Sequence, residues 1–519
     1  MSTTAGWRLL LGLALRRDRV LTGVWIAVLV MMSVASAAAT PSLYAAQADR
    51  VHAAEALNAS PAIVALYGPV LDVTSEGELA MTKMTVLYAV FVAVLFVVVV
   101  RRHTRVEEES GRTELVGGTA VGRNAPLAAV AVETVLLALA LGVLTALGNT
   151  ASGLPLAGSV AFGGLWAGTG LVAAGIAAVT AQISASARTC AGFAAGAIGV
   201  LFVLRAAGDT GPEWLSWLSP LGWNTQVGAY AATRWWLLAA YPVLALALGA
   251  VAVALRARRD LGSGLVAARP GPASGSPRLA DAFTLALRTS GTTLVLWMAA
   301  AGVMGVVFGM IAPGIGDLLD SQTAQSIIDE LGGELVAAIL SIVAVVLTYF
   351  AATVVAHTSR DETDGRAELV LATGTSRSAW FGATLLVALA GTALLLVMTG
   401  LGLWIGYVAA DGPGIGNLLV AALAWVPAAW VVGALAVLSL AWGTRWTVLA
   451  WVWPAAFMVL ALMGDLLELP TWVIDLSPYT HVPAVPSEPW SWGSATTLSA
   501  VAAVLLLVAW WRFRERDIH

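Results

Sequence analysis

Two polar segments of closely similar sequence each stand between long apolar runs, and this repetition constrains the fold more than any other feature. The first segment begins at His103 and the second at His357, and 10 of 21 positions are identical between residues 103–123 and 357–377. A repeat of this kind is typical of an internal duplication. We therefore predict two related halves, each with one charged segment at a corresponding place.

Each copy carries local signals of a short helix at the membrane surface. The spacing of a capping box occurs at Thr104 with Glu107 and at Ser359 with Glu362. Acid and base stand four residues apart in the order that favours a helical ion pair, at Glu108 with Arg112 and at Glu362 with Arg366. The pattern predicts one interfacial helix in each copy.

The composition excludes an ordinary soluble protein. Of the 519 residues 59% are hydrophobic and only 11% are charged, and the mean hydropathy is +0.85. A soluble protein carries roughly 25% charged residues. The chain is therefore predicted to be an integral membrane protein. Cys190 is the single cysteine, so an intramolecular disulfide is impossible. Because it lies in an apolar region, it is expected to be a small core residue.

Apolar runs long enough to cross a bilayer occur about six times in each half. In the first half they cover residues 20–40, 84–100, 126–148, 156–181, 188–206 and 230–255. In the second half they cover residues 292–312, 335–356, 379–409, 416–441, 447–463 and 493–511. Amphipathic segments at 6–19 and 285–288 precede the first spans and predict in-plane elbow helices. The expected fold is all-α, with about twelve transmembrane helices in two six-helix repeats.

The boundary between the halves is marked by composition. Residues 260–278 are rich in Gly, Pro, Ser and Ala, which is typical of a flexible linker. We therefore expect a first six-span repeat over residues 1–259, a cytosolic linker over 260–278, and a second repeat over 279–519.

Arginine distribution predicts the orientation of the chain in the membrane. Segments 314–333, 410–415 and 464–491 contain acids but no Lys or Arg, whereas arginines crowd the elbows, both duplicated segments, the linker and the C-terminal tail. Basic residues near span ends favour the cytoplasmic side. Both termini and both duplicated segments are therefore expected in the cytoplasm, with the chain spanning the plasma membrane many times.

A second repeated element lies on the expected outer side, between the fifth and sixth spans of each half. Residues 214–220 and 472–478 both begin with Trp and end in Leu-Ser-Pro. Two interpretations stay open: an anchoring turn in the headgroup zone, or a re-entrant hairpin that closes the outer end of a pathway. The candidate residues are Trp217, Ser219, Pro220, Trp472, Ser477 and Pro478.

Motifs of catalysis and metal binding are missing from the sequence. It has no Gly-Lys-Ser/Thr P-loop, no HExxH and no Cys/His cluster, and nothing indicates a nucleic-acid partner. His103 and His357 are expected to be interfacial anchors. We therefore predict no catalytic residue, no metal site and no cofactor bound by this chain.

Few polar residues interrupt the predicted spans. A charge such as Glu133 within a span is costly, so we expect it either to have a structural partner or to serve a substrate or proton. Arg205 and Arg234 flank the outer loop of the first half, where they either act as intramembrane sites or extend outward to water. Gly192 and Gly196 have the Gly-x-x-x-Gly spacing of close helix packing.

The duplicated motif resembles that of permease subunits of ABC-2 type exporters. The pattern E-x-x-G-R-x-E-L runs from Glu108 to Leu115 and again from Glu362 to Leu369. The outer Leu-Ser-Pro turns also look like that family. The fusion of two permease halves, with Arg-Arg-Asp-Leu-Gly at 258–262 leading into the linker, is similar to actinobacterial exporters of polyketide antibiotics of the tetronasin type.

This resemblance implies a pseudo-dimeric permease that exports hydrophobic compounds across the lipid membrane. Two copies of a separately encoded ATPase subunit would bind ATP and Mg²⁺ and would dock on one coupling helix in each half. The implied coupling residues are Glu107, Glu108, Arg112, Glu114, Leu115, Asp361, Glu362, Arg366, Glu368 and Leu369.

Two alternatives belong to other classes of protein. An ion-coupled secondary transporter would need several acids near the bilayer midplane, and Glu133 aligns with Val387 in the other half. A membrane scaffold or sensor would normally include a recognisable soluble domain, which this sequence lacks.

Overall fold

The computed structural model describes residues 3–266, 274–277, 279–317, 322–410, 418–463, 470–485 and 488–517. Within these ranges every regular element is a helix, which confirms the predicted all-α class. The chain divides into two compact units, Met1–Gly271 and Pro272–His519, called unit 1 and unit 2 below. The division falls within residues 260–278, where the composition predicts a linker.

Unit 1 contains six long helices and a set of short ones. The long helices are α1 (Trp7–Leu43), α4 (Glu76–His103), α7 (Ala125–Ala151), α8 (Leu156–Ile183), α9 (Ala187–Thr210) and α12 (Ala240–Ala257). The short helices are α2 (Gln47–Ala59), α3 (Pro61–Tyr67), α5 (Arg105–Glu109), α6 (Arg112–Gly117), α10 (Trp214–Trp217), α11 (Pro220–Val227) and η1 (Trp235–Ala239).

Unit 2 follows a related order of elements. Its long helices are α13 (Ala282–Asp317), α14 (Gln322–Thr363), α16 (Arg377–Ala409), α18 (Val426–Trp442), α19 (Leu449–Met463) and α21 (Trp492–Glu515). Its short helices are α15 (Arg366–Leu371), α17 (Leu418–Leu423), η2 (Thr444–Val448), α20 (Thr471–Ile474) and η3 (Pro478–His481).

Eleven helices among the described residues are long and apolar enough to cross a membrane. They match eleven of the twelve predicted runs. The twelfth, predicted at 447–463, forms η2 and α19, and α19 covers only 15 described residues. The acidic segments used to predict orientation lie partly outside the described residues, as do residues 267–273 and 278 of the predicted linker.

The elbows predicted as separate in-plane helices are instead the first turns of longer helices. α1 runs without a break through residues 6–19 and the first predicted span, and its only proline is Pro41 near its end. α13 likewise continues through residues 285–288. No residue near Arg19 interrupts the backbone hydrogen bonds of α1, so nothing separates an elbow from the span.

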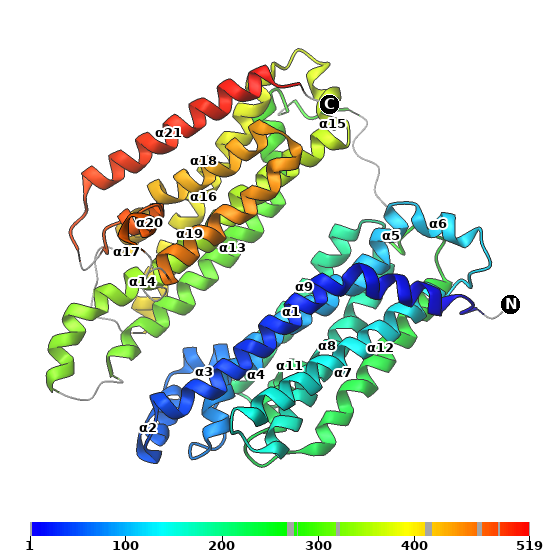
Figure 1. The fold of residues 1–519 in the computed structure, drawn as a ribbon, viewed down its shortest axis with the longest axis vertical. Coiled ribbons are helices and arrows are strands. Elements are labelled where there is room, and N and C mark those ends of the chain that lie inside the picture. Colours follow the sequence, from blue (N-terminus) through cyan, green and yellow to red (C-terminus); the bar gives the residue numbers. More distant parts are fainter. Residues whose placement is uncertain are drawn as a thin grey trace. The chain divides into compact units, whose positions relative to one another are not determined.

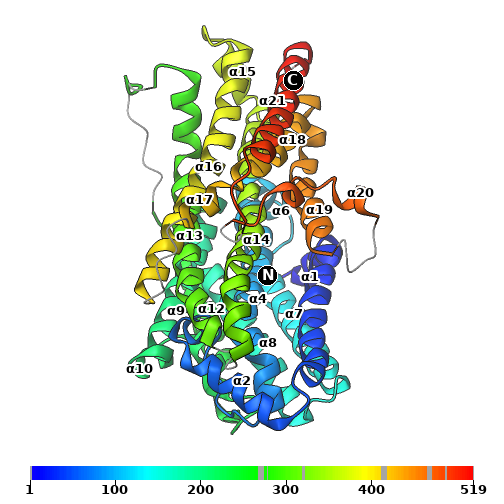
Figure 2. The same ribbon diagram turned by 90° about the vertical axis from the view of Figure 1, so that its left-hand side faces the viewer.

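The core of each unit forms around its most buried spans. In unit 1, α8 packs against α4, α7 and α12, while α1 runs beside α4 and α7 (Figure 1). Trp166 of α8 is fully buried, and its Nε1 donates to the carbonyl oxygen of Met84 at 3.0 Å. In unit 2, α21 lies along α18, as seen from the side in Figure 2. Two helical bundles with apolar cores are thus built one after the other along the chain.

Close backbone contact occurs at glycines other than the predicted pair. A Cβ added at Gly163 of α8 would lie 2.2 Å from the carbonyl oxygen of Gly142 in α7. In unit 2, a Cβ at Gly406 of α16 would lie 2.0 Å from the carbonyl oxygen of Val306 in α13. At Gly192 and Gly196 an added Cβ would meet nothing within 4 Å. Within unit 1 these two glycines therefore make no close helix contact, because the motif gives spacing but not a facing helix.

Candidate functional site

The first duplicated segment forms two short helices after α4. The backbone turns at Thr104 (φ −119°, ψ −84°), and α5 then covers the acidic run. Gly111 separates α5 from α6 with a φ of 73°, a conformation that glycine adopts without steric cost. The short helix predicted for this copy is therefore a pair of helices joined at a left-handed glycine.

The second copy also ends in a short helix, but the backbone before that helix differs from the first copy. α14 continues through residues 357–363 without interruption, and Gly365 (φ 71°) then leads into α15. The left-handed glycine and the short helix after it are thus common to both copies. The turn at Thr104 belongs only to the first.

Neither capping box forms. The hydroxyl of Thr104 donates to the carbonyl oxygen of Val100, and α5 has no side-chain cap. Ser359 lies inside α14, where its Oγ is 3.4 Å from Oγ1 of Thr447. Both predictions were wrong. In the first copy α5 begins after Thr104, but the Thr104 hydroxyl is turned back to the preceding helix. In the second copy α14 runs through Ser359, so no helix begins there that needs a cap.

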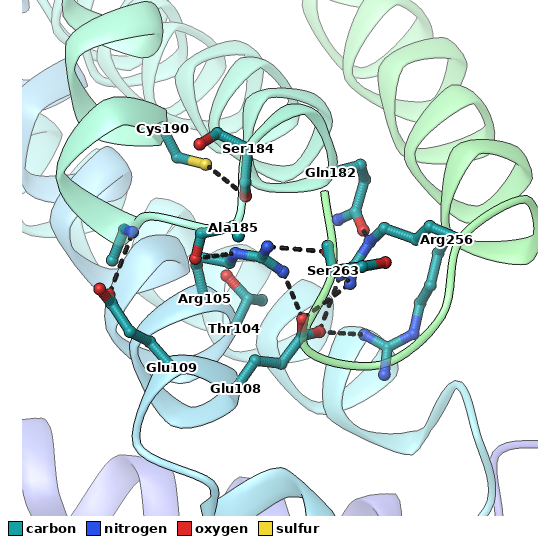
Figure 3. A network of polar contacts seen from close by, with 12 residues as sticks. Thr104, Arg105, Glu108, Glu109, Gln182, Ser184, Ala185, Cys190, Arg256 and Ser263 are labelled. Atoms are coloured by element: carbon teal, nitrogen blue, oxygen red, sulfur yellow. Dashed lines mark hydrogen bonds and ion pairs between the residues drawn. The ribbon is translucent and has the colours of Figure 1, made fainter. Parts of the chain in front are cut away.

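Glu108 is the centre of a buried charge network that includes none of the predicted partners. Its carboxylate accepts two hydrogen bonds of 2.8 Å from Nη1 and Nη2 of Arg259. Arg105 Nη1 lies 2.6 Å from the same carboxylate, and Arg256 Nη1 lies 3.7 Å away. Figure 3 shows Arg105, Glu108 and Arg256 converging at this point. The predicted Glu108–Arg112 ion pair is absent, since Glu108 points into unit 1 while Arg112 stays exposed and contacts Glu107 at 3.4 Å.

The same network fixes the start of the predicted linker. Ser263 accepts hydrogen bonds at its backbone carbonyl from Arg105 Nη2 (2.7 Å) and from Arg259 Nη1 (3.0 Å). The backbone N–H groups of Leu265 and Val266 donate to carbonyls at the end of α8. Residues 260–266, predicted to be flexible, are therefore held against the duplicated segment of unit 1.

A matching tether occurs in unit 2. Glu362 is buried and pairs through both carboxylate oxygens with Nη2 of Arg516, just beyond the end of α21. Arg377 Nη1 donates to the carbonyl oxygen of Arg516 at 3.1 Å. In unit 1, Arg123 Nη2 makes the same kind of bond to the carbonyl oxygen of Arg259. The predicted Glu362–Arg366 pair is absent.

The two tether arginines were missed in the sequence, although a signal for them exists. Arg259 and Arg516 each follow the last helix of their unit and are each followed directly by Asp. The Arg-Asp sequence at 259–260 and 516–517 is a third repeated element, and it could have identified both arginines as candidates. Their partners could not have been assigned, because 151 and 154 residues separate each arginine from its glutamate.

The side of each duplicated segment that faces away from its unit carries an acid and an apolar residue. Glu114 and Leu115 of α6 are exposed, as are Glu368 and Leu369 of α15. The leucines are 79% and 73% exposed. On the same segments, the exposed Arg366 pairs with Asp361 and Asp364, each at 2.8 Å.

The Leu-Ser-Pro turns are fixed by their serines in both units. The Ser219 Oγ donates to the carbonyl oxygen of Leu201 in α9 at 2.7 Å, and the Ser477 Oγ donates to that of Phe457 in α19 at 3.2 Å. Both serines are fully buried, and Pro220 and Pro478 follow as the first residues of α11 and η3. The turns are therefore docked on the preceding helix, a geometry that suits an anchor and a gate alike.

The two candidate tryptophans of these turns differ in burial, since Trp217 is half-buried against the core of unit 1. Trp472 is largely exposed, and Trp217 stacks on Trp236 with 6.3 Å between ring centroids. Arg234, itself exposed, lies over the Trp217 ring at 5.7 Å and donates to Gln226 Oε1 at 2.7 Å. Arg234 is therefore at the surface of unit 1.

Arg205 does not extend outward. Its side chain is fully buried and donates to the carbonyl oxygens of residues 64–66 at the end of α3, besides pairing with Asp209 at 3.1 Å. The alternative that Arg205 extends outward to water is therefore wrong. Arg205 instead satisfies the last carbonyls of α3, those of Ala65 and Leu66, and adds to the bond that Val64 accepts from the Gly68 N–H.

Glu133 is also fully buried, and it lies near two residues that the sequence did not connect with it. His103 Nε2 is 3.9 Å from Glu133 Oε2 and 2.8 Å from Asp18 Oδ2. His103 is therefore an interior residue rather than an interfacial anchor. The single cysteine, Cys190, is buried as expected, and its thiol lies 3.4 Å from the carbonyl oxygen of Ser184.

Comparison with known proteins gives a relative along nearly the whole chain. The "Multidrug efflux system permease protein Rv1217c" of Mycobacterium tuberculosis (strain ATCC 25618 / H37Rv) is 37% identical over 521 residues, covering 98% of this chain and 95% of the relative. Residues 279–514 also match the family described as "Multidrug efflux system permease Rv1217c, C-terminal domain".

These matches agree with the helical architecture. Eleven apolar helices among the described residues and a full-length permease relative make the chain a multi-pass membrane protein. The chain acts in transport, as the permease subunit of an efflux transporter. The chain belongs to the family of multidrug efflux system permeases.

Proposed function

We propose that this chain is the permease of an ATP-driven ABC exporter of the ABC-2 type, acting as a pseudo-dimer on hydrophobic compounds. A fused double permease of the tetronasin-exporter type is the closest functional description. Two copies of a separate ATPase subunit, with ATP and Mg²⁺ bound to them, would supply the energy. The relative's description as a multidrug efflux permease supports export of apolar molecules of varied structure.

One observation carries this proposal. In each unit a buried Glu–Arg ion pair fixes the base of the duplicated segment, while the short helix after it presents an exposed acid and leucine. A helix held rigidly at its base with an unpartnered apolar anchor is suited to a groove on another protein. Glu114–Leu115 and Glu368–Leu369 would enter the ATPase, and the buried pairs would transmit its movement to the last helix of each unit.

Orientation follows from the same proposal. The ATPase acts in the cytoplasm, so α6 and α15 would lie on the cytoplasmic face of the plasma membrane, together with both termini. The arginine distribution supports this arrangement. The bacterial relative supports an actinobacterial type of host.

The test is the double substitution Glu114→Ala with Glu368→Ala, purified with the ATPase encoded beside the permease. A charge that fixes a docking contact costs on the order of 2–5 kcal/mol when its pair is buried. Folding should change by less than about 0.5 kcal/mol because both side chains are exposed. We expect weaker co-purification and loss of substrate-stimulated ATP hydrolysis, with insertion and melting temperature unchanged.

A matched control is Glu55→Ala, an exposed acid on α2. It should leave both co-purification and hydrolysis at wild-type levels. Wild-type activity of the double variant would contradict the coupling role. Uptake driven by a proton gradient in vesicles that contain the permease alone would favour the ion-coupled alternative.

A further inference from the structure

Three ionisable side chains from three helices of unit 1 meet inside the protein. Asp18 comes from α1, His103 is the last residue of α4, and Glu133 lies in α7. They are 1%, 9% and 0% exposed. One ligand atom from each side chain lies within 4.8 Å of the other two.

Glu133 has no hydrogen-bond partner in this cluster, and the basic atom that approaches it, His103 Nε2, is 3.9 Å away. Neither of its carboxylate oxygens accepts a hydrogen bond, although both are inaccessible to solvent. Asp18 contacts His103 and also Arg102, whose Nε lies 3.2 Å from Asp18 Oδ1 and whose side chain is 36% exposed. A buried carboxylate without a partner is strongly unfavourable. A cation bound among the three side chains would supply Glu133 with a counter-charge at closer range than His103 does.

We propose that Asp18, His103 and Glu133 bind one divalent transition-metal ion of the Zn²⁺ or Mn²⁺ class. An imidazole nitrogen with two carboxylate oxygens is a ligand set for such ions, whereas Ca²⁺ and Mg²⁺ prefer oxygen ligands alone. Metal–ligand bonds of about 2.0–2.2 Å place ligand atoms of a tetrahedral site about 3.3–3.6 Å apart. The 2.8 Å and 3.9 Å contacts of His103 each reach that spacing by a shift of less than about 1 Å.

A cavity reaches the site at His103, although neither acid lines it. It has a volume of about 260 Å³ and is lined by His103, by Ala14 and Arg17 of α1, and by Ala129 and Val130 of α7. Ala14 and Ala129 each lie four residues before an acidic ligand, one helical turn away. The cavity therefore borders the cluster and can supply a water molecule as the remaining ligand. It also borders Arg112 and Thr113 of α6, within the duplicated segment.

The metal would tie three helices together at the point where the duplicated segment begins. His103 directly precedes Thr104, where the backbone turns into α5. Occupancy would therefore hold the base of α5 and α6 against α1 and α7. A ligand that binds only the folded state also stabilises it.

Unit 2 lacks this ligand set, which supplies an internal control. The positions that correspond to Asp18, His103 and Glu133 in the repeat are Ser290, His357 and Val387. Neither acid is present there. The proposal therefore predicts one metal ion for each chain and not two.

The experiment uses the full chain in lipid nanodiscs, purified with a tag that contains no histidine and treated with a chelator. Co²⁺ serves as a spectroscopic probe and Zn²⁺ as its competitor. We expect wild type to bind one equivalent of Co²⁺ with visible d–d absorption, and Zn²⁺ to displace it and raise the melting temperature. Glu133→Gln and Asp18→Asn should each weaken binding more than about tenfold, since even outer-sphere changes cost that much.

His357→Asn is the matched control and should leave the affinity and stoichiometry unchanged. Glu133→Gln keeps the volume of the side chain and removes an unpaired charge, so the apo variant should melt at or above the temperature of apo wild type. Failure of wild type to bind Co²⁺ or Zn²⁺, or equal binding by Glu133→Gln, would overturn the metal site. The first result would mean that a proton neutralises Glu133.

Discussion

Glu108 and Arg259 are 151 residues apart in the chain, yet their side chains form a two-point ion pair in the interior of unit 1. The pair joins the duplicated segment to the end of α12, the last helix of the unit. Glu362 and Arg516 make the corresponding connection between α14 and the end of α21. In each unit, therefore, a glutamate of the duplicated segment is paired with an arginine that follows the last helix.

Loss of Glu108 should be among the most damaging changes in unit 1. Glu108→Ala leaves Arg105, Arg256 and Arg259 buried without their shared counter-charge. Breaking a buried pair on one side costs about 3–5 kcal/mol. We expect a large fall in the melting temperature of the purified permease.

Arg366→Ala is the control for that substitution. Arg366 pairs with Asp361 and Asp364, but its side chain is 56% exposed. Its loss should cost at most about 1 kcal/mol, because an exposed ion pair contributes little. Similar melting temperatures for the two variants would contradict the central role of the Glu108 network.

The pair in unit 2 can be tested by removing both partners. Glu362→Met and Arg516→Met should each destabilise the protein, because each leaves one buried charge unpaired. The double variant should be more stable than either single variant, with a coupling energy of about 0.5–3 kcal/mol. Additive effects in a cycle of thermal melts would mean that the two residues act independently.

Glycine substitutions should separate close helix contacts from open positions. Gly163→Ala and Gly406→Ala place a methyl group against a backbone carbonyl, so α7–α8 and α13–α16 must separate. Overpacking of this kind costs about 1–3 kcal/mol. Gly196→Ala meets no neighbour and should stabilise α9 by up to about 1 kcal/mol, since Ala is the better helix former. A shift of the same sign in all three melting temperatures would refute this assignment of contacts.

Cysteine labelling tests the proposed orientation. The single native cysteine is buried and would first be replaced by Cys190→Ala. Ser42→Cys after the first span and Ser110→Cys in the duplicated segment are both at exposed positions. In intact cells an impermeant maleimide should label only Ser42→Cys, whereas both should react in lysed cells. Preferential labelling of Ser110→Cys in intact cells would reverse the topology and exclude docking of a cytoplasmic ATPase.

Hydropathy by itself determined most of the architecture. Long apolar runs must become helices in a bilayer, because every backbone polar group has to find its partner within the segment. This is why eleven predicted spans match eleven helices, and why the repeat at 103–123 and 357–377 correctly marked corresponding places. The predictions of individual ion pairs were wrong. Glu108–Arg112 and Glu362–Arg366 have suitable spacing, but local spacing does not state which side of a segment faces the protein.

The tertiary structure alone decided the partners of the charged residues. Burial makes an unpaired charge so unfavourable that Glu108, Glu362 and Arg205 take whatever partners the packing brings within reach, however distant in sequence. The meeting of Asp18, His103 and Glu133 has the same origin, since three helices must pack before the cluster exists. The sequence determined that this chain is a duplicated bundle of membrane helices with an exposed motif in each half. Helix packing determined which of its few charged side chains meet. In an apolar interior a charge is stable only where a partner lies within contact distance, and helix packing sets that distance.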